Sequence, residues 1–174
     1  AAYNDKTAND IKTITVTYKL SGADLANYTF DGNTADSSGQ VTDTLTGKIT
    51  RKEISVTGGI TATGKEYDGK ATIALTGTPE TNGFVKDDDV SFSAINGQTG
   101  TVENPNVGDG KPVTVTKETL NALLTGADAN NYTVSDDYTG ATVDITKRTV
   151  YLLFPGESTH DPDWKKSVPY SAGG

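Results

Sequence analysis

An internal repeat is the feature that most constrains how this chain can fold. Residues 20–24 read Leu-Ser-Gly-Ala-Asp and are followed by Asn27-Tyr28-Thr29. Residues 124–128 read Leu-Thr-Gly-Ala-Asp and are followed by Asn131-Tyr132-Thr133, at an offset of 104 residues. Self-similarity over such a distance indicates a chain built from repeated structural units.

Two further stretches match at slightly different offsets. Residues 14–17 match 113–116 at an offset of 99, and residues 49–52 match 145–148 at an offset of 96. Because loops gain and lose residues, small differences between offsets are expected, and the unit is 96–104 residues long. Solenoid repeats are only ~20–45 residues long, so this unit is long enough to fold as an independent domain.

The matches divide the chain into three parts. We expect residues 51–146 to be one complete repeat and residues 1–50 to be the C-terminal half of a preceding one. Residues 147–174 start a following unit or form a C-terminal tail. No Pro- or Gly-rich hinge lies between residues 49 and 56, so we expect short linkers that restrict motion between units. The chain reads as a piece of a longer protein.

Apolar residues alternate with polar ones along much of the chain, which is typical of half-buried strands. Ile14 and Val16 alternate with threonines, and Val113 and Val115 do the same. Turn signals such as Asn-Gly and Gly-Gly separate these stretches. The pattern predicts an all-β chain of tandem antiparallel β-sandwich repeats with an Ig-like topology. Residues 117–124 are good helix formers, so a β-grasp-like α+β repeat is the alternative.

The composition excludes several kinds of site. The chain has no Cys and one His, so it offers no thiol nucleophile, disulfide or thiolate metal site. Its net charge of −8 disfavours nucleic-acid and anionic lipid partners. No stretch approaches the ~18 apolar residues of a membrane-spanning helix. We expect no membrane insertion and no enzymatic activity.

Five motifs follow one another in a fixed order within residues 51–146. They are Lys65-Glu66-Tyr67-Asp68-Gly69, Asp88-Asp89-Val90, the stretch 106–111 with Val113-Thr114-Val115, the stretch 124–133, and 141–146. This order resembles the YDG repeat, a module found in tandem in large bacterial surface proteins and haemagglutinin-like adhesins. The resemblance extends to residues 2–50, with an extra loop near 31–40. It implies extracellular, multi-copy presentation and no catalytic residue.

Residues 147–174 depart from the resemblance, because no Tyr-Asp-Gly follows in 151–174.

Two motifs are predicted to be structural. In Tyr67-Asp68-Gly69, Asp accepts a hydrogen bond from its own backbone and Gly takes a positive φ, which makes a turn. Asn131-Tyr132 is read as a buried corner at the start of a strand. Both Asn-Tyr-Thr sequences also match the N-glycosylation pattern, which is the alternative.

Acidic clusters are the candidate metal sites. Ca²⁺ prefers several carboxylate oxygens, and these clusters have no EF-hand spacing, so solvated acidic turns are the alternative. The candidate ligands are Asp87, Asp88, Asp89, Asp136 and Asp137. No other cofactor is expected.

A second group near the C-terminus, His160 with Asp161 and Asp163, is read as part of a loose tail.

Tyr138, Tyr151 and Trp164 are the candidate aromatic residues for stacking on a sugar. Lys12 and Lys111 occupy the same position of the repeat. A lysine there could form an isopeptide crosslink, but the sequence does not indicate the acceptor and acid that such a bond needs.

From these observations we expect an extracellular structural stalk or spacer on the bacterial cell surface, with neighbouring repeats of the same chain as its partners. The alternative is an adhesin module that recognises a host glycan or protein through its loops.

Overall fold

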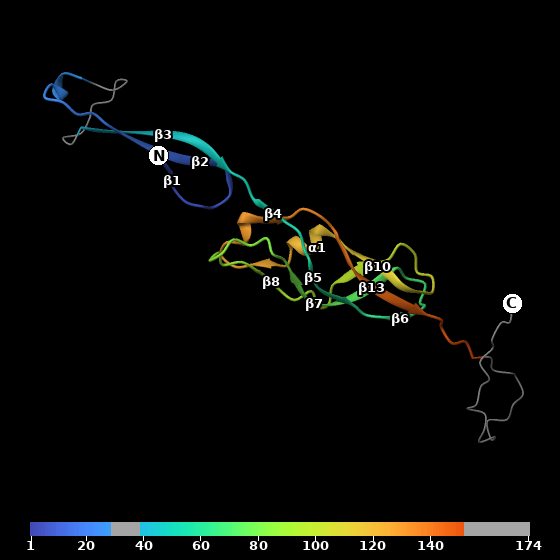
Figure 1. Ribbon diagram of the computed structural model, residues 1–174. Helices are drawn as coiled ribbons and strands as arrows, with labels where there is room; N and C mark the ends of the chain where they lie inside the picture. The colour runs from blue at the N-terminus through green and yellow to red at the C-terminus, as the bar shows by residue number, and fades with distance from the viewer. Residues whose placement is uncertain (29–38, 152–174) are drawn as a thin grey trace, which may run out of the picture.

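The computed structural model describes residues 1–28 and 39–151, and these form two bodies that lie end to end (Figure 1). The first is a three-stranded sheet, here called the N-terminal sheet. The second runs from Lys52 to Thr146 and is here called the compact unit. Only Thr50 and Arg51 separate the last strand of the sheet from the first strand of the unit.

The N-terminal sheet is antiparallel throughout and has the order β1-β2-β3. Its strands are β1 (Ala2–Tyr3), β2 (Asn9–Lys19) and β3 (Gln40–Ile49), and a short 3-10 turn, η1 (Leu25–Asn27), follows β2. The apolar residues Ile14 and Val16 lie on one face of β2 because alternate side chains of a strand share a face. Both are only half-buried.

Ten strands make up the compact unit, all of them within the described residues. They are β4 (Lys52–Ile54), β5 (Gly58–Ala62), β6 (Lys65–Glu66), β7 (Thr72–Glu80), β8 (Ser91–Phe92), β9 (Thr99–Thr101), β10 (Gly108–Val115), β11 (Leu124–Thr125), β12 (Tyr132–Val134) and β13 (Tyr138–Thr146). Helix α1 (Lys117–Asn121) and the 3-10 turn η2 (Ala129–Asn131) follow β10 and β11.

Six of these strands form one curled sheet in the order β5-β7-β9-β10-β13-β6. The two outer strands, β5 and β6, are consecutive in the chain and are joined by Thr63 and Gly64. The sheet therefore has to curl until its edges approach each other. A Cβ added at Gly64 would lie 3.4 Å from the carbonyl oxygen of Asp144, so this connection runs against β13.

The core lies inside this curl because alternate residues of the long strands point inwards. Strand β13 buries Ala141, Val143 and Ile145, while the residues between them face solvent. Burying a large aliphatic side chain contributes about 1.5–3 kcal/mol, so such a core is the main stabilising term. The other core residues are Ile54, Ile60, Ile73, Leu75, Phe92, Ile95, Val102, Val113, Val115, Leu120, Leu123, Tyr132 and Val134.

Helix α1 falls within the predicted stretch 117–124. It begins after Thr116, whose hydroxyl accepts a hydrogen bond from the backbone N–H of Thr119. Leu120 is fully buried and ties the helix to the core. The Asn121 side chain donates to the carbonyl of Val134 (2.9 Å) and accepts from its N–H (2.8 Å). The Asn121 side chain therefore makes the two backbone hydrogen bonds that a neighbouring strand would make to Val134 of β12.

The all-β prediction is confirmed, but the predicted antiparallel sandwich is not. The compact unit has one curled sheet and two short two-stranded pairings, β8 with β11 and β4 with β12. Two pairs, β4 with β12 and β6 with β13, are parallel. Alternation in a sequence assigns side chains to faces but does not say which strand pairs with which, so it could not give this arrangement.

Candidate functional site

The Tyr67-Asp68-Gly69 motif forms the turn that follows β6. The Asp68 carboxylate accepts a hydrogen bond from the backbone N–H of Lys70 at 2.9 Å, and Gly69 has a φ of 76°. An L residue with a side chain rarely adopts this left-handed region, whereas glycine does so at little cost. Tyr67 itself remains partly exposed at the surface.

Lys65 fastens both arms of this turn. Its ammonium donates to Asp68 Oδ1 (2.7 Å) and to the carbonyls of Lys70 (2.7 Å) and Thr72 (3.1 Å). The hydrogen bond from Lys65, followed by that from the Lys70 backbone, lowers the pKa of Asp68. The backbone N–H of Tyr67 donates to the carbonyl of Thr146 at 2.9 Å, so the turn lies where the chain leaves the compact unit.

Tyr132 is the anchor of a corner at the other end of the compact unit. Its hydroxyl donates to Asp88 Oδ2 at 2.6 Å and accepts from the backbone N–H of Val85 at 3.0 Å. Its ring meets that of Phe84 edge to face, with centroids 5.3 Å apart. Burial, and then the hydrogen bond to Asp88, raise the pKa of Tyr132.

Two further aspartates complete this acidic corner. Asp89 accepts from the backbone N–H of Ala127 at 3.0 Å, and Asp128 accepts from the N–H of Asp89 at 3.0 Å. Hydrogen bonds from Lys6 and then from Tyr132 lower the pKa of Asp88. The carboxylates at this corner therefore hold loops together through ordinary donors.

The remaining acidic candidates lie apart. Asp87 is exposed and has a φ of 70°, Asp136 accepts from the Ser135 hydroxyl at 2.7 Å, and Asp137 accepts from the backbone N–H of Lys117 at 2.8 Å. Within residues 1–28 and 39–151, no group of three acidic or histidine side chains converges as metal ligands. Calcium binding stays a prediction.

A joint between the two bodies forms at the acidic corner. Lys6 of the N-terminal sheet lies 2.8 Å from Asp88 Oδ1 and 2.9 Å from Asp128 Oδ2. The backbone N–H of Ala8 donates to Asn131 Oδ1 at 2.8 Å. Sequence reasoning missed this joint because the lysine is not repeated. At the offset of 99, the position that corresponds to Lys6 is Pro105.

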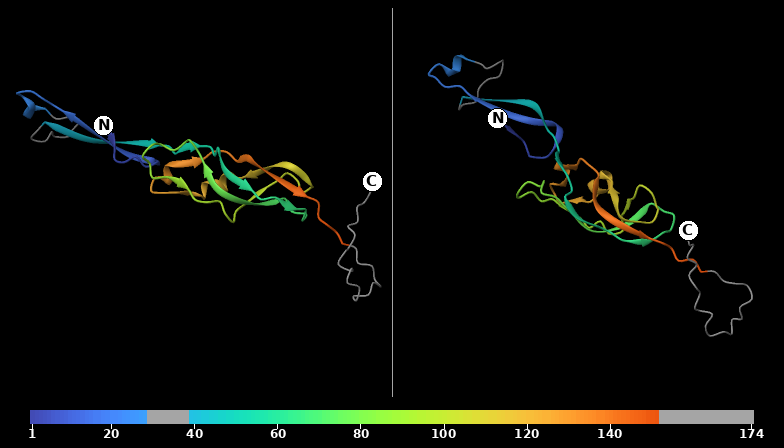
Figure 2. Two further views of the ribbon diagram at one scale, coloured as in Figure 1. Left: turned by 60° about the horizontal axis from the view of Figure 1, so that its bottom comes forward. Right: turned by 45° about the vertical axis from the view of Figure 1, so that its right-hand side comes forward.

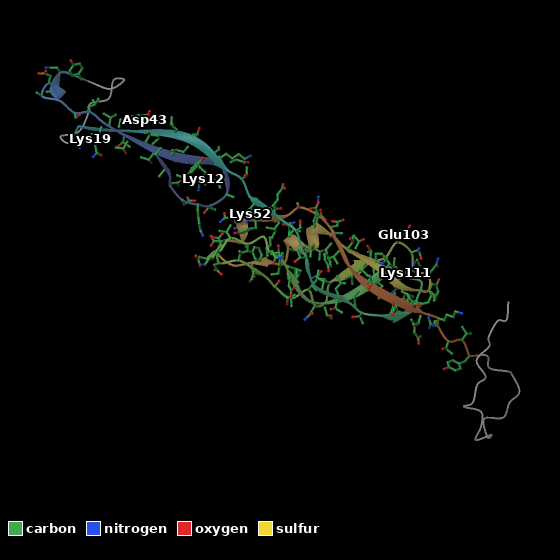
Figure 3. All side chains as sticks on the ribbon, in the orientation of Figure 1. Lys12, Lys19, Asp43, Lys52, Glu103 and Lys111 are labelled. Atoms are coloured by element: carbon green, nitrogen blue, oxygen red, sulfur yellow. The ribbon has the colours of Figure 1, made fainter. Side chains whose placement is uncertain are left out.

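Lys12 and Lys111 make the same kind of contact in the two bodies. Lys12 Nζ is paired with the Asp5 carboxylate, and Lys111 Nζ donates to Asn104 Oδ1 at 2.8 Å. Each partner lies seven residues before its lysine. The sequence did not reveal these acceptors. Both lysines hold the loop that precedes their strand through charge-assisted hydrogen bonds. Figure 3 labels the two lysines, Lys12 in the N-terminal sheet and Lys111 in the compact unit.

The aromatic candidates are not gathered in the described part of the chain. Tyr138 begins β13 and packs against the core, whereas Tyr151 is exposed beyond the C-terminal end of that strand. Trp164 lies outside the described residues, as do His160, Asp161 and Asp163. A sugar-stacking platform stays a prediction.

A curled β-sheet, with loops fastened by aspartate and lysine side chains, defines a small all-β module of a repeating chain. The YDG domain family matches residues 50–142, which is more than half of the chain, and the chain belongs to this family. No curated protein and no solved structure gives a significant match. Among the described residues, no helix is long and apolar enough to cross a membrane.

Proposed function

We propose that the chain is a non-catalytic stalk segment of a large bacterial cell-surface protein, in which YDG units hold a distal head away from the cell. The proposal includes extracellular presentation, an adhesin-like parent protein and tandem repeats. Its finer fold assignment is that each repeat is an Ig-like sandwich. The partners are neighbouring repeats of the same chain.

The joint is the observation that carries this proposal. Two residues connect the bodies, and Lys6 and Ala8 add contacts from the N-terminal sheet to the compact unit. A short connection with side contacts limits bending between neighbours, which a spacer needs. The two bodies follow one another along a line in two further views (Figure 2).

The acidic composition also supports a crowded surface role. A net charge of −8 keeps closely spaced copies apart in solution. The carboxylates of Asp88 and Asp128 at the joint are paired with Lys6 inside one molecule.

One hollow supports the alternative function, recognition of a host glycan or protein. It has a volume of about 500 Å³ and is open to solvent beside Lys111. The lining residues include Glu103, Asn104 and Asp109. Polar groups that converge in a hollow can bind a sugar hydroxyl, so this surface is the one to test.

A binding screen and a shape measurement together test the proposal. Small-angle scattering should give an elongated particle with the two bodies in line. The melting midpoint should not change with millimolar Ca²⁺ or across a panel of host glycans, because only a ligand of the folded state raises it. A compact particle contradicts the stalk. A higher midpoint with one sugar class supports the adhesin module instead.

A further inference from the structure

The pairing of strands in the N-terminal sheet repeats that of the compact unit from Asn9 to Ile14, which correspond to Gly108 and Val113. With the offset of 99 for β2 and 96 for β3, the pairs of β2 with β3 in this stretch fall on pairs of β10 with β13. The pairs Asn9↔Ile49, Lys12↔Gly47 and Ile14↔Leu45 correspond to Gly108↔Ile145, Lys111↔Val143 and Val113↔Ala141. Both pairings also shift register directly before the lysine. The β10–β13 pairing shifts again after Val113, whereas the β2–β3 pairing continues in register.

Strand β1 corresponds in the same way to β9. Ala2 pairs with Thr15, and at the offset of 99 this pair becomes Thr101 with Thr114, which is the pair that joins β9 to β10. The N-terminal sheet is therefore equivalent to β9-β10-β13, the middle of the curled sheet. In the compact unit the outer edges of that group pair with β7 and β6. In the N-terminal sheet these two edges carry no strand among the described residues.

The face of the N-terminal sheet is less covered than its equivalent at several matching positions, although Lys12 and Val41 on this face are buried. Leu45 is 51% exposed, whereas its equivalent Ala141 is 5% exposed and lies inside the core. Ile14 and Ile49 are half-buried, whereas Val113 and Ile145 are fully buried. In the compact unit, core residues between Ile54 and Val102 help to cover this face.

The corner formed by the sequence Gly-Ala-Asp and the following Asn-Tyr shows the same difference. Tyr28 is 67% exposed, but its equivalent Tyr132 is 3% exposed beneath Phe84 and Val85. A Cβ at Gly126 would meet the Asp89 carbonyl oxygen at 2.2 Å, but one at Gly22 would meet nothing within 4 Å.

A hollow of about 210 Å³, lined by Gly22, Asp24 and Tyr28 among others, lies at this corner. Its position matches the place that the segment around Asp89 fills in the compact unit.

We propose that the N-terminal sheet is an acceptor surface for the N-terminal half of a YDG unit, a segment with the pattern of residues 51–99. This segment supplies an antiparallel strand to β1, as β7 does to β9, and a parallel strand to the end of β3, as β6 does to β13. Its apolar residues cover Ile14 and Leu45, and its loop covers Tyr28. The inference rests on strand register and burial, not on the stalk role.

The test extends the chain with a copy of residues 51–99 placed directly before Ala1, because Ala1 corresponds to Gly100 at the offset of 99. Hydrogen exchange at residues 13–17 and 42–48 should slow by about 100-fold or more, since their local opening becomes part of a cooperative unit. A second thermal transition should appear. Unchanged exchange in the extended chain overturns the proposal.

One substitution separates the acceptor surface from general destabilisation. Leu45→Asp should leave the melting and exchange of the original chain unchanged, because the side chain is already exposed. In the extended chain it should abolish both the second transition and the added protection. Ala141→Asp is the matched control, since it buries a charge in the compact unit and should lower its melting in both chains.

The original chain provides a second, independent readout. If a second copy were the occupant instead, this chain would be a dimer in sedimentation and residues 13–17 would already be protected. That result overturns the proposal. A monomer with fast exchange at these residues supports it.

Discussion

Lys6 and Asp88 lie 82 residues apart in the chain, and an ion pair of 2.8 Å joins them across the boundary between the two bodies. The same ammonium reaches Asp128 at 2.9 Å. One side chain therefore bridges two acidic loops of the compact unit, one of which is also held by Tyr132. The joint is built on the same corner that stabilises the unit.

Removing this bridge should loosen the joint without unfolding either body. Lys6→Ala should broaden the distribution of distances between spin labels on cysteines introduced at Thr44 and Glu118, measured by double electron–electron resonance. The chain has no native Cys, so the labels are specific. The melting midpoint should change little, because the lysine is exposed and exposed ion pairs contribute little to stability.

Lys48→Ala is the matched control for the bridge. It removes the same charge from an ion pair with Asp10, at 2.7 Å, that lies wholly within the N-terminal sheet. The distance distribution should stay narrow. An equal broadening in both variants would mean that overall charge, rather than this bridge, sets the orientation.

Acid should release the joint in a defined direction. The pKa of Asp88 lies below its ordinary value of 3.8, mainly because of the hydrogen bond from Lys6. A lowered pKa in the folded state means that the stabilisation is present above pH about 4 and is lost as the pH falls through the lowered pKa. The label distances should therefore be narrow at pH 5–8 and broaden at the acid end. Lys6→Ala should show broad distances at every pH.

Part of this architecture follows from the sequence. The repeated Gly-Ala-Asp and Asn-Tyr residues predict equivalent corners, and η1 and η2 do fall at the same offset of 104. In both, the backbone N–H of the Asn bonds to the Asp carbonyl at 2.9 Å. Local hydrogen bonds of this kind depend on neighbouring residues, so a short motif is enough to specify them.

The partners of distant strands could not be read in the same way. Nothing in residues 52–54 or 132–134 indicates that β4 and β12 pair in parallel. The backbone N–H and C=O groups that form this pairing are the same in every strand, so they do not specify a partner. Lys6 and Asn121 were likewise missed. Lys6 acts through ion pairs with Asp88 and Asp128, and Asn121 acts through hydrogen bonds to the backbone of Val134. Neither residue belongs to a periodic pattern.

Asn121 should be among the most important polar side chains of the compact unit. Asn121→Ala removes hydrogen bonds to both backbone groups of Val134 and to the carbonyl of Lys117. At about 1 kcal/mol for each, the variant should lose about 2–3 kcal/mol in the free energy of unfolding, measured by urea denaturation. Asn130→Ala, at an exposed position nine residues along, should be nearly neutral. Equal losses would contradict the role of Asn121.

Tyr132 and Tyr28 provide an internal comparison at one position of the repeat. Tyr132→Phe leaves the Val85 N–H without its partner and should cost about 1–2 kcal/mol in the free energy of unfolding. Tyr28→Phe removes a hydroxyl from an exposed ring and should have no measurable effect. Similar values for both in urea denaturation would mean that the hydroxyl of Tyr132 contributes nothing.

Two glycines test how far the turns depend on backbone conformation rather than on space. Gly69 has a φ of 76° and open space around it, so Gly69→Ala should cost about 1 kcal/mol, the penalty for the left-handed region alone. Gly126 has a φ of 109°, and a Cβ there would lie 2.2 Å from the Asp89 carbonyl oxygen. Gly126→Ala should therefore cost several times more, because the backbone of the acidic corner must move.

Gly22→Ala, at the same repeat position but with nothing within 4 Å, carries only the backbone penalty. Urea denaturation of the compact unit should rank the variants Gly126, then Gly69, with Gly22 showing no effect on that transition. If Gly126→Ala were no worse than Gly69→Ala, the close packing of the two loops at the corner would be wrong.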